Sequence, residues 1–262
     1  MIDTMWHVDN GGLLVHDAFT AFGILVAGAI FVAEARRQGR LDLAMWSIGA
    51  GSLVGAAIGA RAAFVWRYVT LSPEPTVRGF LLQGGKSVVG GLAGAYLGAV
   101  LTKHLLGYRD STGDVFAPAI AVGLAVGRIG CLLTEPPGTS TSLPWGIRLT
   151  AAEIAATPGC DTCRPGVAYH PSFIYEIVLL VAIAASLVWL RRTTVFPGEL
   201  FLIFLLSYSV VRFALEFTRS NPDMAFGLSG TQLLLLPSIL VLGVRLTRRH
   251  HAAMQPAWDP GG

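Results

Sequence analysis

Long apolar runs, separated by short polar segments, occupy most of the chain. Seven of them reach about 20 residues, the length that an α-helix needs to cross the hydrocarbon core of a membrane. They cover approximately residues 13–35, 42–64, 88–106, 115–134, 172–190, 198–219 and 230–247. This pattern predicts an all-α integral membrane protein with about seven transmembrane helices, in a single membrane domain over residues 1–262.

The longest polar segment, residues 135–170, separates the fourth run from the fifth. Its Pro-Pro-Gly and Pro-Gly sequences indicate turns, so we expect a loop-rich external cap, with a short strand near Trp145–Leu149. Residues 250–262 are expected to form a cytoplasmic tail. The helical bundle then extends from about residue 13 to residue 250.

Basic residues cluster after every second apolar run. Because cytoplasmic loops of membrane proteins are enriched in Lys and Arg, this distribution predicts an external N-terminus and a cytoplasmic C-terminus. Composition agrees with a membrane protein, since 53% of residues are hydrophobic and 13% are charged. The net charge is +3 and the basic residues form no stripe, so we expect no nucleic-acid partner.

The sixth run carries polar residues at helical spacing. Tyr208, Arg212, Glu216 and Arg219 follow one another at intervals of four, four and three residues, which confines them to one helix face roughly 80° wide. A charge at the bilayer centre costs at least about 2.5–3.5 kcal/mol, so this face should point toward protein or water. It is either a functional site or a structural ion pair between Arg212 and Glu216.

Arg128, in the fourth run, lies at a depth similar to that of Arg212, and the polar residues of the runs gather in the outer half of the membrane. We expect no buried charge in the inner half. A transporter would place its site near the midplane, so the distribution favours binding or chemistry at the outer leaflet.

The three cysteines have separate interpretations. Cys160 and Cys163 form a C-x-x-C sequence in the external segment, where a disulfide is the leading interpretation and a redox pair or half of a zinc site is the alternative. Cys131 lies at membrane depth and is interpreted as a packing residue, with a nucleophilic thiol as the alternative.

Several short motifs follow one another along the chain. They are Gly59-Ala60-Arg61, GGKSVVGG at 84–91, GRIGCLLTEPPG at 127–138, HPSFIYE at 170–176, the Tyr208 to Arg219 pattern, and Gln232 with Pro237. With these motifs the chain resembles the prolipoprotein diacylglyceryl transferase family from about residue 13 to residue 250. The resemblance implies a multi-pass protein of the bacterial cytoplasmic (inner) membrane.

It further implies an enzyme that moves the diacylglyceryl group of phosphatidylglycerol, or of a related anionic phospholipid, onto a cysteine thiol of an exported lipoprotein precursor. No cofactor and no metal are expected. The predicted catalytic residues are Arg128, Arg212, His170, Lys86 and Glu216. The predicted substrate-binding residues are Arg61, Tyr208, Tyr175, Arg219, Glu135 and Gln232.

The chain departs from the family pattern at three positions. Val89 stands where the family has a histidine proposed as the catalytic base, Cys131 replaces an asparagine, and Pro136 replaces a glutamate, with Glu135 one residue earlier. Other bases would then be needed to deprotonate an acceptor thiol. The candidates are Lys86, His170 and Asp17, although Lys86 would equally suit a headgroup contact and His170 a helix cap.

These departures leave other functions open. A paralogue with the same lipid donor and a different acceptor is one alternative. A lipid-binding or membrane-assembly protein without catalysis is another, and it would explain the loss of the histidine most simply. Transport ranks third because of the predicted absence of charge in the inner half.

Overall fold

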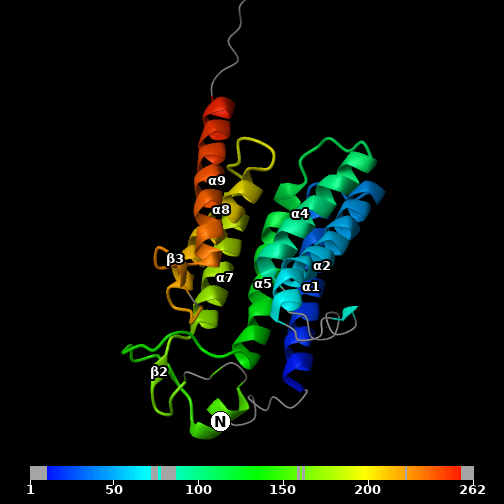
Figure 1. Cartoon of the computed structure of the whole chain (residues 1–262). Helices are drawn as coiled ribbons and strands as arrows, with labels where there is room; N and C mark the ends of the chain where they lie inside the picture. Colours follow the sequence, from blue (N-terminus) through cyan, green and yellow to red (C-terminus); the bar gives the residue numbers. More distant parts are fainter. Residues whose placement is uncertain are drawn as a thin grey trace, which may run out of the picture. The chain divides into compact units, whose positions relative to one another are not determined.

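A computed structural model describes residues 11–71, 76–77, 87–157, 160, 163–221 and 223–254. Seven long helices follow the predicted apolar runs (Figure 1). They are α1 (Gly11–Arg37), α2 (Leu43–Leu71), α4 (Val88–Leu105), α5 (Gly113–Thr134), α7 (Ser172–Leu190), α8 (Glu199–Glu216) and α9 (Gly230–Met254). Lys86 lies outside the described residues.

Six of these helices are long and apolar enough to cross a membrane. The helix that falls short is α8, whose 18 residues include the charged residues Glu199, Arg212 and Glu216. The prediction of a mostly helical multi-pass membrane protein is therefore confirmed. The count of seven spans and the orientation of the termini stay predictions.

The described residues form two compact units, one from residues 11–33 with those of 111–254 and the other from those of 34–110. In the smaller unit, α2 packs against α4 through glycines spaced four apart. A Cβ atom added at Gly55 would lie 2.2 Å from the carbonyl oxygen of Gly94, and one added at Gly98 would lie 2.2 Å from that of Gly51. The absence of side chains at these positions lets the two backbones touch, as small residues do in membrane helix pairs.

In the larger unit, α7 packs against both α5 and α8, and α8 packs against α9. Fully buried apolar side chains fill this core, among them Val115 on α5, Leu180 and Leu187 on α7, and Phe204 on α8. The packing brings the C-terminal ends of α5 and α8 beside the N-terminal ends of α7 and α9. Polar side chains gather at this end of the unit.

The segment between α5 and α7 contains short elements. Strands β1 (Ile147–Arg148) and β2 (Ala168–Tyr169) pair antiparallel, with Ile147 opposite Tyr169. Between them lies α6 (Ala151–Ala156), which begins with a capping box between Thr150 and Glu153. The strand expected near residues 145–149 is confirmed. So is the disulfide, which joins Cys160 to Cys163.

One expectation about charge is wrong. Glu199, in the first turn of α8, is only 5% exposed, and its Oε1 lies 2.8 Å from Nδ1 of His250. Nearby, the Asp114 carboxylate accepts a hydrogen bond of 2.6 Å from the backbone N–H of Gly198, where α8 begins. A buried charge therefore also occurs at the end of the unit opposite the polar cluster, where it secures the ends of α8 and α9.

Candidate functional site

Glu176, on the first turns of α7, is the centre of a buried polar cluster. Its side chain is wholly buried, and its Oε1 lies 2.9 Å from Nε of Arg128 on α5. The Tyr208 hydroxyl on α8 donates a hydrogen bond of 3.1 Å to the same oxygen, and Arg219 donates one of 2.8 Å to Oε2. We call these four residues the Glu176 cluster. Four chain segments thus meet on one carboxylate.

A second carboxylate, Glu216, ends α8 and organises its own set of partners. Its Oε2 forms an ion pair of 2.5 Å with Nη1 of Arg212, one helical turn earlier. Its Oε1 accepts hydrogen bonds from Asn221 at 2.8 Å and from Ser229 at 2.7 Å. Gln232 supports this arrangement by accepting a 2.9 Å hydrogen bond from the Ser229 backbone. The ion pair between Arg212 and Glu216, which was the alternative interpretation of this helix face, is present in the structure.

Arg219 reaches the site by a different route from the one predicted. Helix α8 ends at Glu216, with Phe217 as its C-cap, so Arg219 does not continue the helical stripe. It lies in the turn that follows, and its guanidinium stacks over the Phe173 ring at 4.6 Å. The sequence spacing predicted a shared helix face, whereas a tertiary hydrogen bond to Glu176 holds this side chain.

His170 and Tyr175 also meet, with His170 Nδ1 3.4 Å from the Tyr175 hydroxyl. That hydroxyl also accepts a 2.8 Å hydrogen bond from the indole of Trp145, in the segment between α5 and α7. The N-cap of α7 is Pro171, so the interpretation of His170 as the helix cap is wrong. Tyr175 precedes Glu176 on the first turns of α7, so both groups are anchored at the same end of this helix.

A polar pocket of about 360 Å³ opens beside Glu216 and Arg219. The Nε atom of Arg219 is buried and has no hydrogen-bond partner among the described residues. Most of the wall of the pocket is polar. Its lining comprises Thr139, Glu216, Phe217, Arg219, Ser220, Asn221, Asp223, Gly227, Ser229 and Gln232. The Nε donor of Arg219 therefore remains available to an entering polar group.

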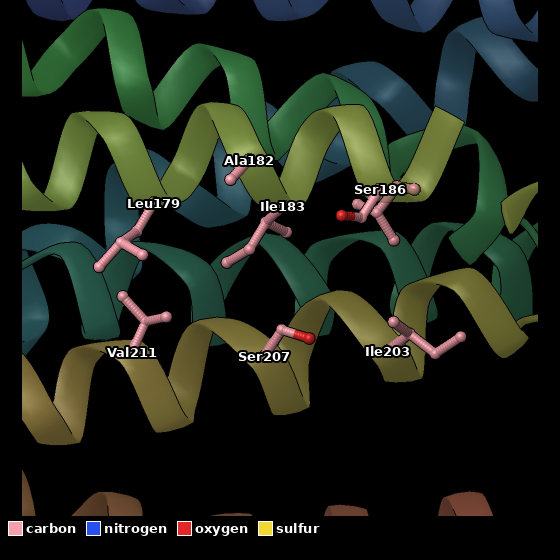
Figure 2. A pocket seen from close by; sticks show the side chains of 8 residues that line it. Leu179, Ala182, Ile183, Ser186, Ile203, Ser207 and Val211 are labelled. Atoms are coloured by element: carbon pink, nitrogen blue, oxygen red, sulfur yellow. The ribbon is translucent and has the colours of Figure 1, made fainter. Parts of the chain in front are cut away.

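An apolar groove of about 160 Å³ lies between α7 and α8. Figure 2 shows its side chains reaching toward one another from the two helices, with Leu179 opposite Val211 near one end and Ser186 opposite Ile203 near the other. Val211 directly precedes Arg212, so the groove runs along α8 away from the polar cluster. Its mostly apolar lining suits a hydrocarbon chain.

Three further side chains meet at the C-terminal end of α5. His16 Nε2 lies 3.6 Å from Cys131 Sγ and 3.8 Å from Glu135 Oε1. Glu135 was predicted to bind substrate and Cys131 to pack, but nothing in the sequence joined them to a histidine more than 100 residues away. The Glu176 side chain was likewise missed as a site residue. The signal for Glu176 was its position as the sole charge within the run 172–190.

Two predicted residues are not placed with these clusters. Arg61 lies on α2 in the smaller unit, which is described separately, and Lys86 is outside the described residues. Ser87 is the N-cap of α4, where its hydroxyl accepts a 3.1 Å hydrogen bond from the Gly90 backbone. Val89, two residues later, is 42% exposed. The roles of Arg61 and Lys86 stay predictions.

The charges of the two carboxylate groups do not balance. Arg128, Arg212 and Arg219 contribute three buried positive charges, whereas Glu176 and Glu216 contribute two buried negative charges. The carboxylate of Asp223 also lines the pocket, but it is exposed to solvent. A surplus cation in a buried site is costly unless an anion joins it. The arrangement is therefore suited to binding one anionic group, and guanidinium donors match the oxygens of a phosphate.

Comparison with known proteins shows the family of this chain. The family model for prolipoprotein diacylglyceryl transferase matches residues 7–247. A phosphatidylglycerol–prolipoprotein diacylglyceryl transferase of Rhodococcus jostii is 30% identical, with 90% of this chain and 69% of that protein aligned. Proteins of the same name from Finegoldia magna (28% identical; 94% and 90% aligned) and Bordetella parapertussis (33% identical; 72% and 71% aligned) are also similar. The chain belongs to the prolipoprotein diacylglyceryl transferase family.

Proposed function

We propose that this protein is a membrane transferase that moves the diacylglyceryl group of phosphatidylglycerol onto the cysteine thiol of an exported lipoprotein precursor. The observation that carries the proposal is the surplus of one buried guanidinium beside a polar pocket, in a bundle of membrane-length helices. The names of the similar proteins supply the donor and the acceptor. The site would face the outer leaflet of the bacterial inner membrane.

The donor fits the charge and shape of the site. A phosphatidylglycerol headgroup carries one negative charge, which would balance the surplus cation. The buried Nε of Arg219 offers a free donor to a phosphate oxygen. Asn221, Ser229 and Gln232 line the pocket beside it and hold the Glu216 carboxylate in place through their hydrogen bonds. An acyl chain would occupy the groove between Leu179 and Val211.

The reaction would create negative charge on the phosphate group, beside the three arginines. The thiolate sulfur forms a bond to the terminal carbon of the diacylglyceryl group, and the bond from that carbon to the phosphate oxygen breaks. Glycerol phosphate leaves with the electron pair and gains a second negative charge. Arginines already oriented by Glu176 and Glu216 would stabilise the transition state, in which this charge develops, more than the ground state. Such preferential stabilisation accelerates a reaction.

The roles of the predicted residues follow from this arrangement. Arg128, Arg212 and Arg219 would bind the phosphate, and Tyr208, Glu176 and Glu216 would hold the guanidinium groups in position. His170 and Tyr175 would face the entering acceptor from the external segment. Val89 is the observation that keeps a second candidate, a transferase with the same donor and a different acceptor, because acceptor activation must differ from the family pattern.

Reconstitution tests the proposal directly. Vesicles that contain the protein, labelled phosphatidylglycerol and a lipobox peptide should yield a thioether-linked diacylglyceryl peptide. Arg212→Ala should abolish both lipid binding and product. Arg192→Ala, at an exposed turn after α7, serves as the matched control and should retain both. Lipid binding that depends on Arg212, without any product, would reject the transferase and support a lipid-binding protein.

A further inference from the structure

His16, Cys131 and Glu135 form a compact cluster next to the Glu176 cluster. Their ligand atoms, Nε2, Sγ and a carboxylate oxygen, all lie within 4.8 Å of one another. Cys131 is buried, whereas the side chains of His16 and Glu135 are 27% and 42% exposed. The group is therefore anchored in the protein and reachable from its edge.

Close packing of α1 against α5 brings these residues together. A Cβ added at Gly23 would lie 2.6 Å from the carbonyl oxygen of Gly123, so the two backbones touch there. Nearer the cluster, a Cβ at Gly130 would lie 3.0 Å from Cβ of Phe19 and 3.2 Å from the His16 carbonyl oxygen. Glycine at these positions lets His16 approach the residue that follows Gly130.

The two nitrogens of the His16 ring face different partners. Nε2 faces Cys131 and Glu135, whereas Nδ1 lies 3.5 Å from Oδ1 of Asp17. A carboxylate beside the distal nitrogen is the usual neighbour of a metal-binding histidine, because it fixes the tautomer that leaves the other nitrogen free. Asp17 therefore orients the ring for coordination through Nε2.

The distances fit a tetrahedral zinc ion. With Zn–N of about 2.05 Å and Zn–S of about 2.3 Å, tetrahedral geometry separates the nitrogen and sulfur ligands by about 3.6 Å, and the observed Nε2 to Sγ distance is 3.6 Å. The same geometry requires about 3.4 Å between nitrogen and oxygen ligands, against 3.8 Å observed. A small rotation of the part-exposed Glu135 side chain closes that gap.

We propose that His16, Cys131 and Glu135 bind a zinc ion that activates the acceptor thiol, an inference that rests on the proposed function. Three protein ligands and one open position are typical of catalytic zinc sites. The acceptor cysteine fills the open position as a thiolate, and its proton passes to the water it displaces and then to solvent. The sequence alone predicted no metal at this place.

The zinc site would supply what the valine at position 89 cannot. A free thiol with a pKa of about 8.5 is about 3% ionised at pH 7, whereas a metal-bound thiol is ionised completely. The zinc-held sulfur then attacks the terminal carbon of the diacylglyceryl group, and glycerol phosphate leaves. No separate protein base is needed within the membrane.

The position of the cluster suits this transfer. Arg128 Nη1 lies 3.6 Å from Cys131 Sγ, so the proposed metal adjoins the guanidinium that also contacts Glu176. The thiolate and the phosphate would thus meet at neighbouring sites. The Cys131 thiolate and the carboxylates of Glu135 and Asp17 provide three negative charges, which offset the repulsion between the zinc ion and Arg128.

Metal binding can be measured without activity. Purified protein without a polyhistidine tag should bind one Zn²⁺ per chain, and Co²⁺ in its place should give the near-ultraviolet absorption of a cobalt–thiolate bond. Cys131→Ser should remove this absorption, and His16→Gln and Glu135→Gln should weaken Co²⁺ binding at least tenfold. His104→Gln, an exposed histidine on α4, is the matched control and should bind normally.

Activity and lipid binding then separate this inference from the proposed function. A chelator should slow transfer about 30-fold, in line with the ionised fraction of a free thiol, and Zn²⁺ should restore it, while phosphatidylglycerol binding stays unchanged. Absence of the cobalt–thiolate absorption overturns the zinc site even if transfer occurs. Transfer that resists the chelator but is lost in Lys86→Met overturns it too, and assigns thiol activation to Lys86.

Discussion

Arg128 on α5 and Glu176 on α7 form an ion pair with Nε and Oε1 2.9 Å apart, and the carboxylate is wholly buried. Tyr208 and Arg219 contact the same carboxylate from α8 and from the turn after it. Glu176 therefore fixes the relative positions of three chain segments at the site. It does so without occupying the pocket that the proposed lipid headgroup would enter.

Removal of this carboxylate should destabilise the protein strongly. Glu176→Gln keeps the size of the side chain but leaves two buried guanidinium groups without their counter-charge, a loss of about 3–5 kcal/mol for a buried pair. Thermal unfolding in detergent should show a clear fall in melting temperature. Asp110→Asn, an exposed acid-to-amide change, should leave it unchanged. Equal melting temperatures for both variants would contradict a structural role for Glu176.

Headgroup binding should depend on the forked shape of Arg219. Arg219→Lys keeps the positive charge but replaces the forked N–H donors of guanidinium with a single ammonium group. The lysine would therefore lose a hydrogen bond either to the phosphate or to Glu176. We expect phosphatidylglycerol affinity to fall about tenfold, or about 1.4 kcal/mol. Titration of lipid into detergent-solubilised protein measures this, with Arg192→Lys as the control. An unchanged affinity for phosphatidylglycerol would show that the lipid phosphate does not bind at Arg219.

Tight packing between α2 and α4 should make Gly55 intolerant of any side chain. The Cβ of Gly55→Val would overlap the Gly94 carbonyl, so α2 and α4 must separate. We expect this to lower the free energy of unfolding by at least about 1–3 kcal/mol. Gly28→Val provides the matched control, because no atom lies within 4 Å of the Cβ that it adds. Protease resistance and melting temperature should fall only for Gly55→Val. An equal fall in melting temperature for the two variants would show that helix propensity, and not packing against α4, causes the loss of stability.

The disulfide between Cys160 and Cys163 should stabilise the segment between α5 and α7 locally. It closes a short loop, for which chain entropy predicts about 2 kcal/mol. The double change Cys160→Ser with Cys163→Ser should increase cleavage of residues 135–170 by external protease. Reduction of the wild-type protein should produce the same cleavage pattern. Cleavage that is insensitive to both treatments would assign the stability of this segment to the β1–β2 pairing instead.

Much of the helical architecture could be predicted because its causes are local. The length of each apolar run is set by bilayer thickness, and all seven runs correspond to helices. The Arg212–Glu216 pair also followed from the sequence, since residues four apart share a face of one helix. The family motifs identified most members of the two carboxylate groups before any contact was known.

The central contacts of the site depend on tertiary packing. Periodicity placed Arg219 on α8, but the helix ends at Glu216 and Arg219 turns back to Glu176. The role of Glu176 became evident only when α5, α7 and α8 were placed together. Likewise, His16 and Cys131 are 115 residues apart in the chain, and only the glycine contacts between α1 and α5 bring them within 3.6 Å.

The sequence by itself determined which segments are helical and which polar residues must be sheltered from lipid, because hydrophobic length and charge cost are properties of each segment alone. Tertiary structure decided which arginine meets which carboxylate and which three ligand atoms converge on one point. Such pairings depend on helix packing and on where each helix stops. The distances between the paired groups are set by side-chain volumes and by backbone contacts between helices that are far apart in the chain.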